Sequence, residues 1–408
     1  MIIADLQIHS RYARACSNQI NIDNLEKYAK IKGINLLGTG DFQHPLWNKE
    51  IKEKLEEDEN GILWTKNKFP FMWQTEISLM YKDNGRRAVH LLVYSPNKDT
   101  SDQIIDVLGK KGRLDYDGRP IFGWSCPEFT ETMMQISKDI EIIPAHCMTP
   151  WFGLYGSVSG FNSIKECFKD QSHHIHAVET GMSADPEMLW RLDEKINLVS
   201  FSDAHSFWPW RLGRECTVFE TELDYKKIIN AIRTGEGLKE TIEVNPAYGK
   251  YHYDGHRNCN ISLSPEQTRK LNGICPVCHQ KLTIGVDYRI EELAKKEKGY
   301  TPKNAKPFKS LIPLSEMISA VYNYKQLFGK NVWLIYNKLI EKFGNEFSVL
   351  LNASEKDLLQ VTDKKLVNVI LINREGKLKI QPGYDGVYGK IILNDKDTVS
   401  RQKSLTEF

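Results

Sequence analysis

The feature that most constrains this chain is a series of short apolar segments within residues 1–220, each separated from the next by a polar or amphipathic stretch. Their lengths and their content of Val, Ile, Leu and Phe predict strands. The predicted strands are residues 2–9, 35–41, 71–78, 88–94, 141–146, 177–180 and 198–203. Between the first two, residues 23–32 carry an apolar stripe at helical spacing. This repeated alternation of strand and helix favours a mainly parallel α/β barrel over an open sheet.

Every predicted strand carries a residue type that binds metals, near the carboxyl end of the strand or, for His90, inside it. The candidate metal ligands are Gln7, His9, Asp41, His44, Glu76, His90, His146, Glu179, Asp203 and His205. In barrel folds the carboxyl ends of the strands form one rim, where active sites assemble. Residues two apart, such as Asp203 and His205, point to the same side of a strand. Imidazole and carboxylate ligands together predict a divalent metal centre on that rim.

Such a centre suits the hydrolysis of phosphate esters. Two metal ions a few ångströms apart can bind phosphate oxygens, lower the pKa of a water and stabilise the leaving oxygen. Glu76 is the candidate for a carboxylate that bridges two ions, and we expect Asp203 and His146 to be catalytic beside it. Arg11 and Arg14 follow the first metal-ligand strand and are predicted to grip the phosphate.

These motifs resemble those of the PHP (polymerase and histidinol phosphatase) superfamily. The matching motifs are Asp5-Leu6-Gln7-Ile8-His9-Ser10, Gly40-Asp41-x-x-His44, Glu76, His146 and Ser202-Asp203-Ala204-His205. The resemblance implies a distorted (β/α)7 barrel with two or three divalent ions, Zn²⁺, Mn²⁺ or Mg²⁺, at its catalytic centre. One position departs from the pattern, since Gln7 stands where the family usually has His. A neutral amide oxygen is a weaker ligand than imidazole, so we expect position 7 to hold its metal loosely, to shift the preferred ion or to leave one site part-occupied.

A longer set of segments resembles one branch of that superfamily, the endonuclease Q family of DNA repair enzymes. The segments are residues 9–12, 38–42, 44–47, 178–186 and 201–206. The resemblance implies a metal-dependent DNA endonuclease that acts next to deaminated bases (uracil, hypoxanthine, xanthine) or abasic sites. It also implies nicking on the 5′ side and DNA with damaged bases as partner. A replication clamp as a further partner, and the oligomeric state, stay open at this point.

Three of the eight cysteines cluster late in the chain, where His256-x-x-Cys259 and Cys275-x-x-Cys278 form two short ligand pairs. Pairs at this spacing predict a structural Zn²⁺ site of zinc-ribbon type. His252 and His279 are alternative fourth ligands, and His256 is favoured because its spacing mirrors the second pair. We expect the zinc to hold this small segment folded. The scattered cysteines, with no signal peptide or transmembrane run, predict a cytoplasmic protein with free thiols.

Three domains are predicted: residues 1–240 as the catalytic barrel, 241–295 as the zinc-binding domain, and 296–408 as a linker, a helical region and a Gly/Tyr-rich tail. Helices are expected at 225–234, 314–327, 331–343 and 355–360, with a basic linker at 295–309. Residues 343–374 fit either a helix-hairpin-helix DNA-binding element or a plain helical bundle. Residues 374–389 fit either a surface β-hairpin or a loop that reaches the DNA. Candidate rings for stacking on a damaged base are Tyr12, Trp47, Trp151, Phe152, Trp208 and Trp210.

The net charge of +2 gives no overall positive field that would indicate nucleic-acid binding, so two other functions stay open. One alternative is a PHP-type phosphomonoesterase for small molecules. The Cys-rich segment and the C-terminal extension argue against it, because a small substrate needs neither. The other alternative is a non-catalytic DNA-binding repair accessory, with Gln7 marking a decaying centre. The retained carboxylates and histidines argue against decay.

Overall fold

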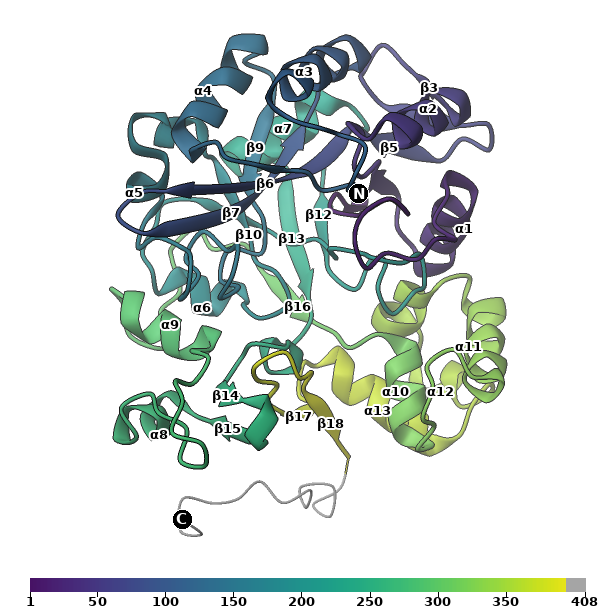
Figure 1. The fold of residues 1–408 in the computed structure, drawn as a ribbon. Coiled ribbons are helices and arrows are strands. Elements are labelled where there is room, and N and C mark those ends of the chain that lie inside the picture. Colours follow the sequence, from purple (N-terminus) through teal and green to yellow (C-terminus); the bar gives the residue numbers. More distant parts are fainter. Residues whose placement is uncertain (394–408) are drawn as a thin grey trace.

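The structure, a computed structural model, describes residues 1–393 of the 408-residue chain. All seven predicted strands are present, in an α/β region that fills the upper part of Figure 1. The predicted strand 71–78 is divided at Trp73 into two strands, β5 and β6, so that the seven predictions correspond to eight strands. Its large sheet contains, in spatial order, β16 (Phe308–Ser310), β13 (Leu238–Glu243), β12 (Cys216–Phe219), β1 (Ile2–Asp5), β2 (Leu36–Gly38), β5 (Pro70–Met72), β4 (Leu63–Thr65) and β3 (Leu55–Glu57). A second sheet contains β8 (Ile121–Phe122), β6 (Gln74–Lys82), β7 (Arg86–Tyr94) and β9 (Glu141–Pro144). A short parallel pair joins β10 (Ala177–Glu179) to β11 (Asn197–Val199).

These sheets follow one another around a ring, which we call the strand ring: β1, β2, β5, β6, β7, β9, β10 and β11. Only Trp73 separates β5 from β6. Past the end of β9, the N–H of Cys147 donates to the carbonyl of Glu179 at 2.9 Å. Past the end of β11, Ala204 forms a parallel bridge to Ile8, just beyond β1. The hydrogen bonding is therefore interrupted between sheets, but each sheet is linked to the next.

The expected α/β class is confirmed, whereas the pairing is more mixed than the predicted mainly parallel arrangement. β7 runs antiparallel to both β6 and β9, and β12 runs antiparallel to β1. The cause is local for β7, because only three residues, 83–85, connect it to β6. So short a connection permits only a hairpin, since a parallel pair needs a long crossover.

The interior of the strand ring is apolar at one end. One buried cluster takes residues from each of its strands except β6, including Ala4, Leu36, Met72, Leu92, Ile143, Ala177 and Val199. The helix α7 (Tyr225–Thr234) completes this cluster with Tyr225, Ile228 and Ile232. Asp224 caps the start of α7, and Gly235 ends it at φ +80°. Because this end is filled, the polar side chains of the interior lie toward the other end, where the carboxyl ends of β1, β2, β9, β10 and β11 meet.

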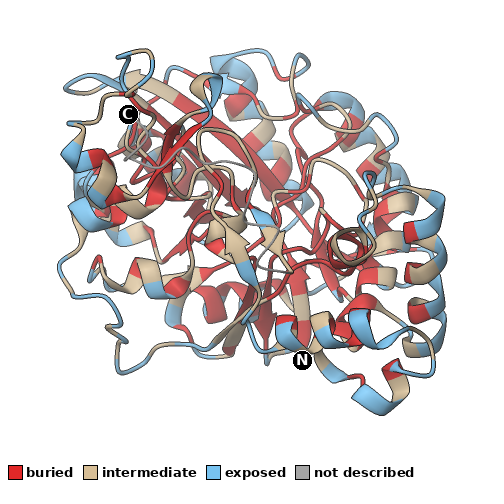
Figure 2. Cartoon of the chain, turned by 90° about the horizontal axis from the view of Figure 1, so that it is seen from below, coloured by how far each residue is buried: buried red, intermediate tan, exposed pale blue. Residues whose placement is uncertain are grey.

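Helices cover the outside of the strand ring, and Figure 2 shows their outer faces exposed and the strands between them buried. They are α1 (Ile22–Lys32), α2 (Pro45–Lys54), α3 (Lys98–Lys111), α4 (Cys126–Ile136), α5 (Ile164–Phe168), the 3₁₀ helix η1 (Lys169–His174) and α6 (Pro186–Trp190). Within residues 1–393 no helix has both the length and the apolarity needed to cross a membrane.

Two smaller units lie below the α/β region in Figure 1. The Cys-rich module, residues 245–293, contains η2 (Pro246–Tyr248), β14 (Asp254–His256), η3 (Arg257–Cys259), β15 (Ile261–Leu263), α8 (Pro265–Lys270) and α9 (Val286–Leu293). The helical region, residues 313–377, contains α10 (Leu314–Val321), α11 (Lys330–Phe343), the π-helix η4 (Ser348–Asn352), α12 (Glu355–Leu358) and α13 (Lys364–Arg374). A C-terminal hairpin, β17 (Lys379–Gln381) and β18 (Lys390–Ile392), follows.

The predicted boundaries between these parts differ from the structure in two places. The expected end of the barrel at residue 240 falls inside β13, and the expected linker ends in β16, which pairs parallel with β13. The predicted helix 314–327 ends at Val321, and Asn323 just beyond has φ +55°. That left-handed conformation is incompatible with a continuing α-helix. Residues 394–408 of the predicted third segment lie outside the described residues.

Candidate active site

Six of the ten predicted metal-ligand residues form two groups at the carboxyl rim of the strand ring. His9, Asp203 and His205 make the first group; Glu76, His90 and His146 make the second. Within each group the ligand atoms lie within 4.8 Å of one another. The first group joins the residues just beyond β1 and β11, and the second joins β6, β7 and the residues just beyond β9. The ring topology therefore brings together side chains that are up to 196 positions apart in the sequence.

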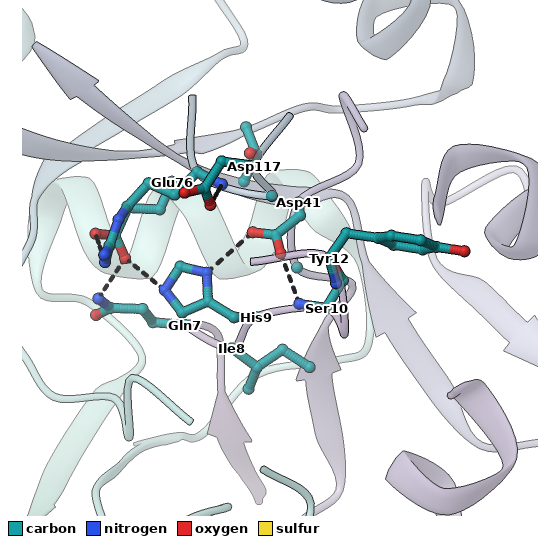
Figure 3. Close-up of polar contacts among 12 residues, drawn as sticks. Gln7, Ile8, His9, Ser10, Tyr12, Asp41, Glu76 and Asp117 are labelled. Atoms are coloured by element: carbon teal, nitrogen blue, oxygen red, sulfur yellow. Dashed lines mark hydrogen bonds and ion pairs between the residues drawn. The ribbon is translucent and has the colours of Figure 1, made fainter. Parts of the chain in front are cut away.

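Glu76 connects the two groups. The β6–β7 register pairs Ser78 with His90, so Glu76 and His90 are diagonal neighbours on one face. The Nδ1 atom of His90 lies 2.7 Å from Oε1 of Glu76, and the Nε2 atom of His9 lies 3.2 Å from its Oε2. Nη1 of Arg119 lies 3.1 Å from Oε1, and the amide of Gln7 donates to Oε2 at 2.9 Å. Figure 3 shows His9 and Gln7 converging on this carboxylate.

Asp41 does not join either group but orients His9. Its Oδ1 lies 3.0 Å from Nδ1 of His9, and its Oδ2 accepts the N–H of Ser10 at 2.6 Å (Figure 3). Both oxygens are thereby occupied within the protein, in a fully buried position. With its Nδ1 held, His9 presents Nε2 to Asp203 at 3.1 Å and to Glu76. A carboxylate behind a ligand histidine fixes the tautomer and raises the basicity of the ring.

Three residues of this rim have a strained backbone: Asp41 at φ +38°, His146 at φ +31° and Asp203 at φ +48°. Such values are uncommon for residues other than glycine and persist only where the surroundings enforce them. At His146 the enforcing residue is Glu179, whose carboxylate accepts the N–H groups of His146 and, at 2.8 Å, of Gly181. Glu179 is thus a buried support for the rim in this structure, and burial raises its pKa to about 7.

Of the remaining predicted residues, Gln7 lies closest to the groups. Its Oε1 atom is buried and has no partner among the described residues, so it can still accept a ligand. His44 stacks on Tyr12 with ring centroids 4.2 Å apart, away from both groups. Arg11 donates to the carbonyl of Ile20 at 2.8 Å and pairs with Glu50 at 2.5 Å. Arg14 is exposed.

The contacts of Arg11 hold its guanidinium at Glu50 and Ile20, outside both ligand groups, and so do not support the phosphate-gripping role predicted for it. Arg119 occupies the corresponding position beside Glu76. The sequence carried no signal for Arg119, a single basic residue in a loop before β8, and only the tertiary structure brings it to the rim.

The electrostatics of Glu76, Asp203 and His90 favour the forms that bind metals. Burial opposes the ionisation of Glu76, but Arg119 and the neighbouring imidazoles outweigh it and hold the pKa of Glu76 well below its ordinary value. Burial also opposes the ionisation of Asp203, but His205 and His9 lower its pKa. Burial and Arg119 lower the pKa of His90 to about 3. Against the effect of burial, the neighbouring carboxylates instead raise the pKa of His9 and of His146, so a bound ion would have to displace protons from these two rings. Ionised carboxylates, a neutral imidazole and the unpartnered Gln7 oxygen fit divalent ions such as Zn²⁺ or Mn²⁺.

A pocket of about 400 Å³ opens on this rim. Its lining includes His90, His146, Asp203, His205, Arg119, Arg214, Glu215, Trp151, Phe152, Lys250, Tyr251 and Tyr388.

Of the six candidate stacking rings, Trp151 and Phe152 line this pocket, and Trp151 is 40% exposed. Trp47 is buried and donates to the carbonyls of Thr39 and Gly40. Trp208 and Trp210 stack on each other and contact Trp333 of α11.

The four residues of the predicted zinc site also lie close together. The ligand atoms of His256, Cys259, Cys275 and Cys278 lie within 4.8 Å of one another. The Nδ1 atom of His256 is 3.2 Å from the sulfur of Cys278. The alternative ligand His252 lies outside this group, and its Nδ1 is buried without a partner among the described residues. Three thiols and one imidazole at a single point fit a tetrahedral, structural Zn²⁺ ion.

Sequence comparisons identify relatives without a described activity. Residues 313–377 match the family described as the MJ0043 C-terminal domain. The chain is 36% identical over 254 residues to uncharacterized protein MJ0043 of Methanocaldococcus jannaschii, covering 60% of this chain but only 31% of that protein's length. It is 28% identical over 416 residues to uncharacterized protein YqxK of Bacillus subtilis, covering 96% of this chain and 99% of YqxK.

Two solved structures match over the whole chain. The lesion-specific endonuclease PfuEndoQ from Pyrococcus furiosus is 30% identical, with a TM-score of 0.85, and the match covers 100% of this chain and 99% of that one. Endonuclease Q in complex with a 27-mer duplex substrate, with an abasic lesion at the active site, is also 30% identical, with a TM-score of 0.86 and 99% coverage of both chains. With this identity over the full length of a solved relative, and with the rim assembled as described, the chain belongs to the endonuclease Q family of DNA endonucleases.

Proposed function

We propose that this chain is a metal-dependent endonuclease that hydrolyses a DNA phosphodiester next to an abasic site or a deaminated base (uracil, hypoxanthine or xanthine), on the 5′ side of the lesion. The observation that carries the proposal is the pair of ligand groups joined by Glu76, four of whose members, His90, His146, Asp203 and His205, line one pocket. A relative with 30% identity has been solved with a lesion-bearing duplex at its active site. A replication clamp as a further partner has no support from these comparisons.

His9, Asp203 and His205 would hold one divalent ion, and Glu76, His90 and His146 would hold another. Gln7 would add a ligand through its unpartnered oxygen. When bound, such ions neutralise phosphate charge and lower the pKa of a water to near neutrality. Asp41 keeps Nε2 of His9 directed at Asp203 and Glu76. Arg119 supplies a guanidinium for a phosphate oxygen, and Trp151 and Phe152 offer ring faces to an unstacked nucleotide.

The test is a cleavage assay on duplexes that carry an abasic site, uracil, hypoxanthine or xanthine, with an undamaged duplex of the same sequence. Each is incubated with the protein and Mn²⁺, Mg²⁺ or Zn²⁺, and either end of the damaged strand is labelled so that the nick can be mapped. We expect nicking of damaged duplexes only, on the 5′ side, and none after chelation. Asp203→Asn should lower the rate at least 100-fold, because it removes a charged ligand.

Two outcomes would contradict the proposal. One is equal nicking of damaged and undamaged duplexes by the wild-type protein. The other is turnover of a small phosphate monoester such as p-nitrophenyl phosphate, abolished by Asp203→Asn, with no cleavage of any duplex. The second outcome would identify the same rim as a phosphomonoesterase centre.

A further inference from the structure

Arg214 has an unusual environment for a buried cation. It is 8% exposed, and its Nε donates to the carbonyl of Ser202 at 3.0 Å. Its Nη1 is buried and has no hydrogen-bond partner among residues 1–393. No carboxylate of the described chain lies within ion-pair distance of it. A buried charge without a counter-charge is costly, and so the position calls for an anionic ligand.

The neighbouring carboxyl group does not supply that counter-charge. Glu215 lies in the same pocket and is fully buried, with one oxygen accepting the N–H of Val244 at 3.0 Å. Burial and the nearby Glu243 raise the pKa of Glu215 well above its ordinary value, which disfavours its charged form. Glu215 also forms no ion pair with Arg214, whose Nη1 has no hydrogen-bond partner among the described residues.

Two further cations surround Tyr388, which hydrogen-bonds to Arg214. Nζ of Lys250 lies 4.7 Å from the centre of the Tyr388 ring, and the guanidinium of Arg211 lies 5.3 Å from it. Arg211 has a carboxylate partner, Glu316, at 3.6 Å, whereas Lys250 has none among residues 1–393. Arg214, Lys250 and Tyr388 thus bring a guanidinium, an ammonium and a phenol to one pocket, and these are groups that bind a phosphate.

We propose that Arg214, Lys250 and Tyr388 form a subsite for a DNA backbone phosphate that neighbours the one being cleaved. The inference rests on the proposed function and deepens it, because it names the group that positions the strand. All three residues line the pocket that holds the metal-ligand groups, and Arg214 bonds to Ser202, the neighbour of Asp203. A neutral base carbonyl would accept the same hydrogen bonds but would leave the charge unbalanced.

The subsite is built from parts far apart in the chain, and backbone contacts fix two of them together. The segment 383–389 bonds to residues 247–253: Gly386 N–H to the Lys250 carbonyl and Gly389 N–H to the Tyr248 carbonyl, both at 3.0 Å. A Cβ on Gly383 would lie 2.2 Å from the carbonyl oxygen of Gly249, so only glycine permits this approach. The strand ring alone therefore lacks the subsite, and the Cys-rich module and the C-terminal hairpin complete it.

The test is to neutralise single phosphates. Duplexes with one abasic site receive one methylphosphonate linkage at each position in turn, and equilibrium binding is measured in the Asp203→Asn background. One linkage beside the cleaved one should weaken binding roughly 10- to 100-fold, the range for a charge-assisted hydrogen bond. Arg214→Gln should weaken binding of the natural duplex by a similar factor and show no further loss at that linkage. Arg86→Gln removes one exposed arginine and serves as the charge-matched control.

Lys250→Gln and Tyr388→Phe provide the same test if Arg214→Gln does not fold. In both variants the methylphosphonate beside the cleaved linkage should weaken binding less than it does without the substitution, and the effects of the other linkages should be unchanged. If every variant stays as sensitive as the wild type to each linkage, the subsite is refuted. It is also refuted if the loss in Arg214→Gln depends on the identity of the base and not on any linkage. A wild-type protein that cuts no damaged duplex would refute the proposed function instead, so that the two failures remain distinguishable.

Discussion

The contacts of Asp41 indicate that the chemistry of the rim also depends on residues that orient the ligand residues without belonging to either ligand group. It occupies both of its oxygens with His9 and Ser10, and it does so from a strained backbone at φ +38°. Asn tolerates the left-handed region but can accept only one of these two hydrogen bonds well. We therefore expect Asp41→Asn to lower the cleavage rate about 10- to 100-fold, the range for partners of metal ligands.

The matched control for this prediction is Asp41→Ala, which removes both contacts and also places an unfavourable residue at positive φ. It should be less active than Asp41→Asn and should melt at a lower temperature. The measurements are single-turnover cleavage rates, bound metal per chain and thermal melting. Full activity and full metal content in Asp41→Asn would show that orienting His9 contributes nothing.

The ligand residues could be predicted from the sequence because residue type and position at a strand end suffice to nominate them. Asp41 and Glu179 could be nominated in the same way. That they support the ligand residues and do not join either ligand group could not be predicted. Whether a carboxylate points at a ligand ring or at backbone N–H groups depends on contacts between residues distant in the chain. Arg119 and Arg214 could not be predicted, since a single arginine in a loop has no periodicity to mark it.

At the scale of elements, all seven predicted strands of the ring were recovered because each is a short apolar run with clear ends. β12 and β13 were not predicted, although they extend the large sheet. Polar residues such as Glu240 and Thr241 interrupt the apolar pattern of β13, and β12 has only four residues, Cys216–Phe219. The reversed direction of β7 was also missed, since apolar character carries no direction. Only the short 83–85 connection could have indicated a hairpin at that point.

The Cys-rich module has only a small apolar core of its own, with Ile261, Leu263, Cys275 and Leu282 as its buried members. A structural zinc contributes about 10–16 kcal/mol to the folding of small metal-binding domains. We expect Cys275→Ser to lose one zinc per chain and to open residues 254–283 to proteolysis. DNA cleavage should fall as well, because Lys250 and Tyr388 depend on this module for their position.

Cys16→Ser is the control for this prediction, because Cys16 lies in the α/β region and outside the four-residue group. It should retain zinc and resist proteolysis as the wild type does. The readouts are metal analysis and limited proteolysis with identification of the cut sites. Normal zinc content in Cys275→Ser would exclude Cys275 as a ligand.

At the scale of the whole molecule, a buried ion pair fastens the helical region to the α/β region. Nζ of Lys32, at the end of α1, lies 2.7 Å from Oε1 of Glu346, and the side chains are 1% and 0% exposed. Lys32 also donates to the carbonyl of Pro209 at 2.8 Å, and Glu346 accepts the hydroxyl of Tyr336 at 2.7 Å. Lys32→Met would leave the Glu346 carboxylate buried without its counter-charge, at a cost of about 3–5 kcal/mol of unfolding free energy.

Chemical denaturation measures this loss, and two variants control it. The double variant Lys32→Met/Glu346→Gln should regain part of the stability, because neither charge then remains unpaired. Lys30→Met, on the same helix, removes the half-exposed partner of Glu26 and should cost no more than about 1 kcal/mol. Equal losses in Lys32→Met and Lys30→Met would mean that the buried pair does not fasten the two regions.

The position of Tyr388 in the pocket has a consequence for how the protein is made. Synthesis proceeds from the N-terminus, so His9, Glu76, His146 and Asp203 leave the ribosome long before the hairpin that carries Tyr388. A nascent or prematurely terminated chain would thus hold the metal-ligand groups without the phosphate subsite. If that subsite positions the strand, the order of translation keeps an incomplete nuclease from engaging DNA.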